Sequence, residues 1–205
     1  MRLRITFSKQ GPLRYTGHLD LHKIWERAAR RADLPLTYSQ GFHPHPQIQL
    51  AAALPLGFSS RCEVVDLKLD ESLPLEGLAG RIQSAVPAGL RILSVESVDE
   101  RAPALQTQVV SAEFEVELLE GIDLDELARR LEAILTADFL PRERRGKPYD
   151  LRLLIEHLAF HTHPARLFMR LAAREGATGR PEEVLDALGI PLESARVERT
   201  KLIFK

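Results

Sequence analysis

The 205-residue sequence contains a single cysteine, Cys62, and this scarcity excludes two classes of protein. One thiol cannot form a disulfide within the chain, and an iron–sulfur cluster generally needs several cysteine ligands. Long apolar runs are also absent, since no stretch approaches the ~18 residues that indicate a membrane span. Residues 1–4 lead directly into a strand-like pattern, without the apolar core of a secretory signal. We therefore expect a cytoplasmic protein that makes no membrane contact.

The motifs of the common enzyme and metal-binding classes are missing as well. The sequence has no phosphate-binding glycine loop, no nucleophile elbow and no EF-hand calcium loop. His18 and His22 are spaced to share a helical face, and His43 and His45 follow nearby. However, the glutamate of the HExxH zinc motif is missing and no cysteine pair completes a ligand set. We expect no metal, no cofactor and no identifiable catalytic residue.

The formal net charge is only −1, yet the charged residues are unevenly distributed along the chain. Residues 1–61 contain nine basic and three acidic residues, residues 62–141 contain six and seventeen, and residues 142–205 contain thirteen and nine. Such segregation favours an anionic partner at the basic segments. The alternative is that every segment simply presents a solvated surface.

Hydrophobic periodicity predicts two halves of similar organisation. The expected order is strand 3–7, helix 18–32, strands 47–51 and 64–69, helix 75–82 and strand 90–98, and then, after a polar connector at 99–108, strand 113–118, helix 124–135, strands 149–158 and 167–171, helix 181–188 and strand 197–204. Each half follows the β-α-β-β-α-β order of the split βαβ motif. We predict an α+β protein of two tandem ferredoxin-like domains, at residues 1–103 and 104–205.

The helix expected at residues 18–32 combines an apolar stripe with a basic opposite side. The candidate binding residues on this helix are His18, Asp20, Arg27, Arg30 and Arg31. Arginine can bind a phosphate through two parallel hydrogen bonds, so the basic side predicts contact with a nucleic-acid backbone. The alternative is that the arginines only keep the helix surface soluble.

The segment at residues 38–46 combines aromatic rings, imidazoles and two stiffening prolines. A rigid loop with these side chains can stack on bases and form hydrogen bonds to their edges. Its candidate binding residues are Tyr38, Gln40, Phe42 and His45. The alternative is an ordered connection whose aromatic rings belong to the core.

A second basic cluster surrounds Gly146 in the second half of the chain. Arg144, Arg145 and Lys147 stand close to this glycine, just before an expected strand. The pattern predicts a β-hairpin arm that grips phosphates. A solvated loop explains the same composition.

Several of these segments together resemble the bacterial radical-SAM-linked protein family, which is found beside or fused to cobalamin-type radical SAM proteins. The segments that carry the resemblance are residues 16–21 (TGHLDL), 26–35, 38–46 (YSQGFHPHP), 53–57 (ALPLG), 147–155 and 179–185. The resemblance covers nearly the whole chain and adds Asp150 and Arg152 to the candidate site. It implies an accessory role beside a radical SAM protein, without implying a reaction.

The favoured hypothesis is an accessory module that binds structured RNA and acts with a radical SAM protein in RNA modification or processing. Two alternatives stay open. Tandem ferredoxin-like domains also resemble the metal-independent endoribonucleases of CRISPR systems, in which case His18 or His22 would act as the general base. A pure protein–protein adaptor is the other alternative, with the acidic middle segment docking a basic partner.

Overall fold

A computed structural model describes residues 1–119, 121–162 and 164–205 of the chain. The chain divides into two compact units, Met1–Val109 and Val110–Lys205. Both units combine helices with antiparallel strand pairs, so the expected α+β class is confirmed. Among the described residues, no helix is long and apolar enough to cross a membrane.

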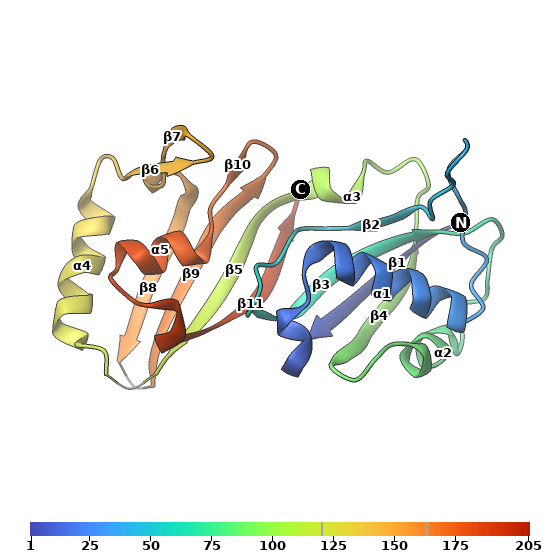
Figure 1. The fold of residues 1–205 in the computed structure, drawn as a ribbon, viewed down its shortest axis with the longest axis horizontal. Helices are drawn as coiled ribbons and strands as arrows, with labels where there is room; N and C mark the ends of the chain where they lie inside the picture. The colour runs from blue at the N-terminus through green and yellow to red at the C-terminus, as the bar shows by residue number, and fades with distance from the viewer. Residues whose placement is uncertain (120, 163) are drawn as a thin grey trace. The chain divides into compact units, whose positions relative to one another are not determined.

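The first unit is an antiparallel sheet with two helices on one face (Figure 1). Its elements are β1 (Arg2–Lys9), α1 (His18–Arg31), β2 (Ile48–Leu50), β3 (Ser59–Lys68), α2 (Leu78–Ala85), β4 (Leu90–Val98) and the short helix α3 (Leu105–Gln108), with a 3-10 turn at Gly11–Tyr15. The strands are arranged in the order β4-β1-β3-β2. The two strands in the middle of this order, β1 and β3, are therefore paired on both sides.

Strand periodicity explains how the core of the first unit forms. Leu3, Ile5 and Phe7 alternate along β1 and are fully buried on the side that faces the helices. Trp25 of α1 is also fully buried, and its ring meets the ring of Phe7 edge-on at 4.8 Å between centroids. The helix ends at Arg31, and Asp33 then takes a positive φ of 50° that breaks the helical conformation.

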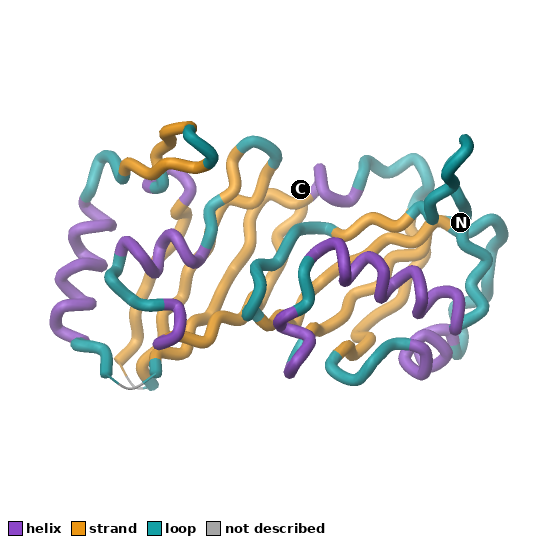
Figure 2. Tube along the Cα trace, viewed as in Figure 1, coloured by secondary structure: helices purple, strands orange, loops and turns teal. Residues whose placement is uncertain are grey.

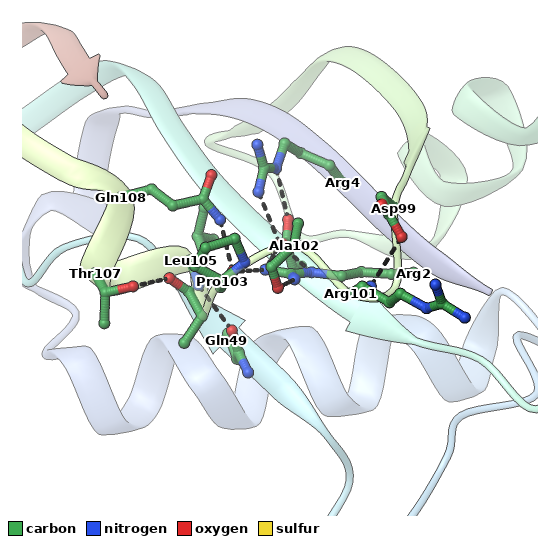
Figure 3. A network of polar contacts seen from close by, with 12 residues as sticks. Arg2, Arg4, Gln49, Asp99, Arg101, Ala102, Pro103, Leu105, Thr107 and Gln108 are labelled. Carbon is green, nitrogen blue, oxygen red and sulfur yellow. Dashed lines mark hydrogen bonds and ion pairs between the residues drawn. The ribbon is translucent and has the colours of Figure 1, made fainter.

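The face of this sheet opposite the helices carries a polar network that holds the segment after β4 (Figure 3). Arg2 donates from Nε to the buried carboxylate of Asp66 at 2.7 Å. Its two terminal nitrogens donate to the carbonyl oxygens of Ala102 and Pro103, at 2.6 and 2.9 Å. Part of the polar connector predicted at 99–108 is therefore attached to the first unit.

The second unit combines an antiparallel sheet with two helices and a separate hairpin. Its elements are β5 (Val109–Leu118), α4 (Leu124–Thr136), β6 (Pro141–Arg144), β7 (Lys147–Asp150), β8 (Ile155–Thr162), β9 (Ala165–Arg174), β10 (Ala177–Thr178), α5 (Pro181–Ala187) and β11 (Ala195–Phe204). The sheet has the order β11-β5-β9-β8, and the short β10 pairs with the end of β9. Strands β6 and β7 form a separate two-stranded hairpin (Figure 2).

Two boundaries differ from the expected ones. The strand predicted at 149–158 is interrupted, because the Asp150 carboxylate accepts hydrogen bonds from the backbone N–H groups of Leu140 and Arg152 and turns the chain there. The unit boundary lies at Val109 instead of between residues 103 and 104. Leu105 is fully buried, and its N–H donates to Gln49 of β2, so α3 belongs to the first unit.

Candidate nucleic-acid interface

Arg27 is the most available cation on α1. Its side chain is exposed on the helix surface, and among the described residues it has neither an ion-pair nor a hydrogen-bond partner. The buried stripe of Leu21, Trp25, Ala28 and Ala29 faces the sheet and leaves the arginines outside the core. The helix therefore presents an uncompensated positive charge to solvent.

Arg30 connects the helix to the loop that follows it. Its guanidinium donates to the hydroxyl of Tyr38 at 3.2 Å and forms an ion pair with Glu26 at 2.7 Å, one turn earlier on α1. The hydrogen bond to Tyr38, together with the negative charge of Glu26, raises the pKa of Arg30. These hydrogen bonds bring the last turn of α1 next to the first residue of the 38–46 loop.

Arg31 has a different neighbour from the other two arginines. Its guanidinium donates from Nε, at 2.9 Å, and from Nη2 to the carbonyl oxygen of Ala85, the last residue of α2. A cation at the end of a helix satisfies an unpaired carbonyl and interacts favourably with the helix dipole. Arg31 therefore joins the two helices of the first unit, and less of its charge is available to a ligand.

The first turn of α1 holds the remaining candidates on this helix. Asp20 is exposed and lies 3.8 Å from the ammonium group of Lys23, which makes a weak surface ion pair. His18 is exposed, whereas His22 is half-buried. The described residues contain no group of three histidine, cysteine or carboxylate side chains that could hold a metal ion.

The loop at residues 38–46 is held closed at its base. Tyr38 and Pro46 form an isolated antiparallel bridge. The N–H of Ser39 donates to the carbonyl oxygen of His45 at 2.8 Å, and the N–H of His45 donates to the Ser39 hydroxyl at 3.0 Å. Beyond this base, Gln40 and the ring of Phe42 are exposed, and Phe42 has a relative exposure of 103%. The expected alternative, that the aromatic ring belongs to the core, does not hold for Phe42.

The basic cluster of the second unit forms the expected hairpin, β6–β7, but Arg144 is used within the fold. Its guanidinium forms an ion pair with Glu183 of α5 at 2.6 Å and lies 4.8 Å from the centre of the Tyr149 ring. Arg145 takes a φ of 53° at the tip of the hairpin, and both Arg145 and Lys147 are exposed. Only these two residues of the cluster are presented to solvent.

Asp150 and Arg152 also stabilise the second unit. The Asp150 carboxylate accepts the two backbone hydrogen bonds that close the hairpin, both at 2.9 Å. Arg152 donates to the carbonyl oxygen of Leu135, near the end of α4, at 3.3 Å and to that of Ile155 at 3.2 Å. Their contacts give both residues a role in the fold, independent of any ligand.

Sequence reasoning missed a polar cavity of about 210 Å³ on the face of the first sheet opposite the helices. The residues that line it are Arg2, Gln47, Gln49, Asp66, Lys68, Glu100, Ala102 and Ala104. The alternation of charged and apolar residues in β1 and at the end of β3 is the signal that could have located it. The Arg2 guanidinium is fully engaged by Asp66 and two carbonyl oxygens, so it has little left to offer a ligand.

The family model described as "uncharacterized protein conserved in bacteria" (DUF2344) matches residues 2–181, which is most of the chain. No curated protein matches the sequence.

Proposed function

The chain belongs to the DUF2344 family of proteins conserved in bacteria, and we propose that it is an accessory module that binds RNA and acts with a radical SAM protein in the cytoplasm. One observation carries the RNA-binding part of this proposal. The Arg30–Tyr38 hydrogen bond joins the basic surface of α1 to a closed loop with an exposed aromatic ring, within a single unit. Cationic and aromatic side chains placed together are the combination that binds single-stranded nucleic acids.

Arg27 and Arg30 have complementary properties as phosphate ligands. Arg27 has no partner among the described residues, so a phosphate can approach it without displacing an ion pair. Arg30 is already oriented by Glu26 and Tyr38, which reduces the conformational entropy lost when it binds an anion. We assign phosphate contacts to these two arginines and base contacts to the loop. His18 and Asp20 lie at the other end of α1, and we assign them to the edge of the surface.

The hairpin tip of the second unit supplies a separate contact. Arg145 and Lys147 are exposed there, and the backbone of the hairpin is fixed by Asp150 and by the Arg144–Glu183 ion pair. A braced hairpin with a basic tip can reach a phosphate backbone with little loss of entropy. We propose that these two side chains hold a second stretch of the same RNA.

We also propose that each unit is ferredoxin-like. The supporting observation is the strand order, which is β4-β1-β3-β2 in the first unit and β11-β5-β9-β8 in the second. In both, the last strand of a β-α-β-β-α-β series lies next to the first. The β6–β7 hairpin is then an insertion after the first helix of the second unit.

The radical SAM partner rests on the resemblance of the motifs at residues 16–21, 38–46 and 53–57 to the radical-SAM-linked proteins. Under this proposal the partner supplies the cluster and the chemistry. The chain described here supplies RNA contacts, in keeping with its lone cysteine, Cys62.

The experiment that tests the proposal identifies what the protein holds in the cell. The full chain is purified after ultraviolet cross-linking, and the bound RNA and bound proteins are both identified. We expect cross-linked RNA and a radical SAM protein from the wild type, and much less RNA from the Arg27→Ala/Arg30→Ala variant. Arg129→Ala/Arg130→Ala is the matched control, because these two arginines also lie exposed on a helix, and both pair with Glu126 as Arg30 pairs with Glu26.

The two alternatives give different outcomes in the same experiment. An endoribonuclease yields RNA that is cut during incubation without metal, with cutting lost when His18 or His22 is replaced. An adaptor yields proteins without RNA, and the two arginine variants then behave alike. Either outcome overturns the proposed function.

A further inference from the structure

We infer that Phe42 is a stacking platform for unpaired nucleotides, and that it makes the first unit select single-stranded segments of RNA over duplex. This inference rests on the proposed RNA-binding function and specifies its substrate class. Phe42 is the most exposed of the large hydrophobic side chains in the described part of the chain, at 103%. A ring that buries no surface contributes nothing to the stability of the folded protein.

The loop that carries Phe42 is built to hold the ring in place. The Tyr38–Pro46 bridge and the two hydrogen bonds between Ser39 and His45 close its base. Gly41, immediately before Phe42, has a φ of 126°, a conformation that favours glycine. The ring is therefore presented on a closed loop, which lowers the entropy lost on binding.

The surroundings of Phe42 favour a base over an apolar pocket on a protein. Its loop neighbours Gln40, His43 and His45 are polar and exposed, so within the loop Phe42 is the only large apolar side chain that is exposed. The core of a protein–protein interface is normally a contiguous apolar patch. The loop also contains no acidic residue, and the Arg30 guanidinium is bound at its base. An exposed aromatic ring on a loop whose base binds a cation is an arrangement that suits a nucleotide.

Selection against duplex follows from the geometry of stacking. In a duplex both faces of each base are already covered by neighbouring bases, so a protein ring can stack only where a base is unpaired. A phosphate contact, by contrast, is available on either form of RNA. The arginines of α1 and the ring of Phe42 are thus expected to contribute differently to the two forms.

The test uses the full chain, a short unstructured RNA strand and the same strand annealed to its complement. Affinities are measured by fluorescence anisotropy at fixed salt. We expect Phe42→Ala to weaken single-strand binding by roughly 5- to 150-fold, the range for the loss of one stacked base, and to leave duplex binding unchanged. Phe42→Trp is expected to retain single-strand binding, whereas Phe42→Leu is expected to lose it although the side chain stays apolar. Phe139→Ala, at another exposed phenylalanine, is the matched control.

The failures of the two proposals are distinguishable. If the wild type binds both RNAs and depends on Arg27 and Arg30, but Phe42→Ala changes both affinities equally or not at all, only the stacking inference is wrong. Retention of single-strand binding by Phe42→Leu also contradicts it, because stacking needs a π-system. If the wild type binds neither RNA, the proposed function fails. If Phe42→Ala instead abolishes binding to a purified radical SAM protein, the ring is a protein contact.

Discussion

Replacement of Asp66 by asparagine is expected to destabilise the first unit strongly. The Asp66 side chain is only 3% exposed, and its carboxylate accepts from Arg2 at 2.7 Å and from Arg4 at 2.9 and 3.0 Å. Asparagine keeps the shape but removes the charge that compensates two largely buried guanidinium groups. The hydrogen bond to this carboxylate is also the largest cause that raises the pKa of Arg4.

The magnitude follows from the burial of the three side chains. Removing one partner of a buried ion pair costs about 3–5 kcal/mol, because the remaining charge is left uncompensated. The arginine side chains are 10% and 17% exposed, so water reaches them in part and the lower end of that range applies. We therefore expect Asp66→Asn to lower the free energy of unfolding by about 3 kcal/mol.

Urea unfolding followed by tryptophan fluorescence reports on the first unit, in which Asp66 lies. Trp25 is the only tryptophan of the chain and is fully buried in the core of the first unit. With m of about 1–3 kcal/mol/M, the midpoint should fall by at least ~1 M. Asp20→Asn is the control, since this carboxylate is 69% exposed and its ion pair is worth at most about 1 kcal/mol. Equal small effects of the two substitutions would refute the role assigned to Asp66.

The remaining predictions concern four other side chains. Arg31→Ala should lower the free energy of unfolding by about 1–2 kcal/mol, because the substitution removes the Arg31 donor from the Ala85 carbonyl at the end of α2. Arg27→Ala should change the free energy of unfolding by less than about 0.5 kcal/mol in the same urea assay. Asp150→Ala should lower the thermal midpoint more than Asp150→Asn, which keeps the oxygen that accepts both backbone hydrogen bonds; equal midpoints would contradict this. Burial raises the pKa of Glu182, so the native state holds this proton more tightly than the unfolded chain does. The free energy of unfolding therefore falls as the pH rises from the pKa of Glu182 in the unfolded chain to its higher pKa in the native state. Glu182→Gln should therefore raise the thermal midpoint at neutral pH and leave it unchanged well below about pH 4; no gain at neutral pH would refute this.

The sequence is sufficient to predict structure where the pattern that determines it is local. The apolar spacing in residues 18–32 identified α1 nearly to its last residue, because a helix on a sheet needs one buried stripe. The proximity of α1 to the 38–46 loop was also predictable, since few residues separate the two segments. The hairpin around Gly146 is also predictable, whereas the break in the strand expected at 149–158 is not, because the Asp150 carboxylate that turns the chain gives no periodic signal.

Contacts between distant residues explain most of what the sequence did not predict about the site. Arg31 looked equivalent to Arg27, but its partner Ala85 lies 54 positions away and could be found only in the folded chain. Asp66 and Arg2 are separated by 64 positions, and neither belongs to a recognisable motif. The exposure of Phe42 was also not predictable, because aromatic residues in loops often pack into the core.

The dependence of RNA affinity on salt tests the central claim, that Arg27 and Arg30 hold phosphates on the surface of α1. The logarithm of the association constant falls linearly with the logarithm of the salt concentration, with a slope of about −0.7 per phosphate contact on single strands. We predict that the Arg27→Ala/Arg30→Ala variant binds the unstructured strand more weakly, with a slope shallower by about 1.4 than that of the wild type. Arg129→Ala/Arg130→Ala should keep the wild-type slope. A slope and an affinity unchanged in the Arg27→Ala/Arg30→Ala variant would contradict the account.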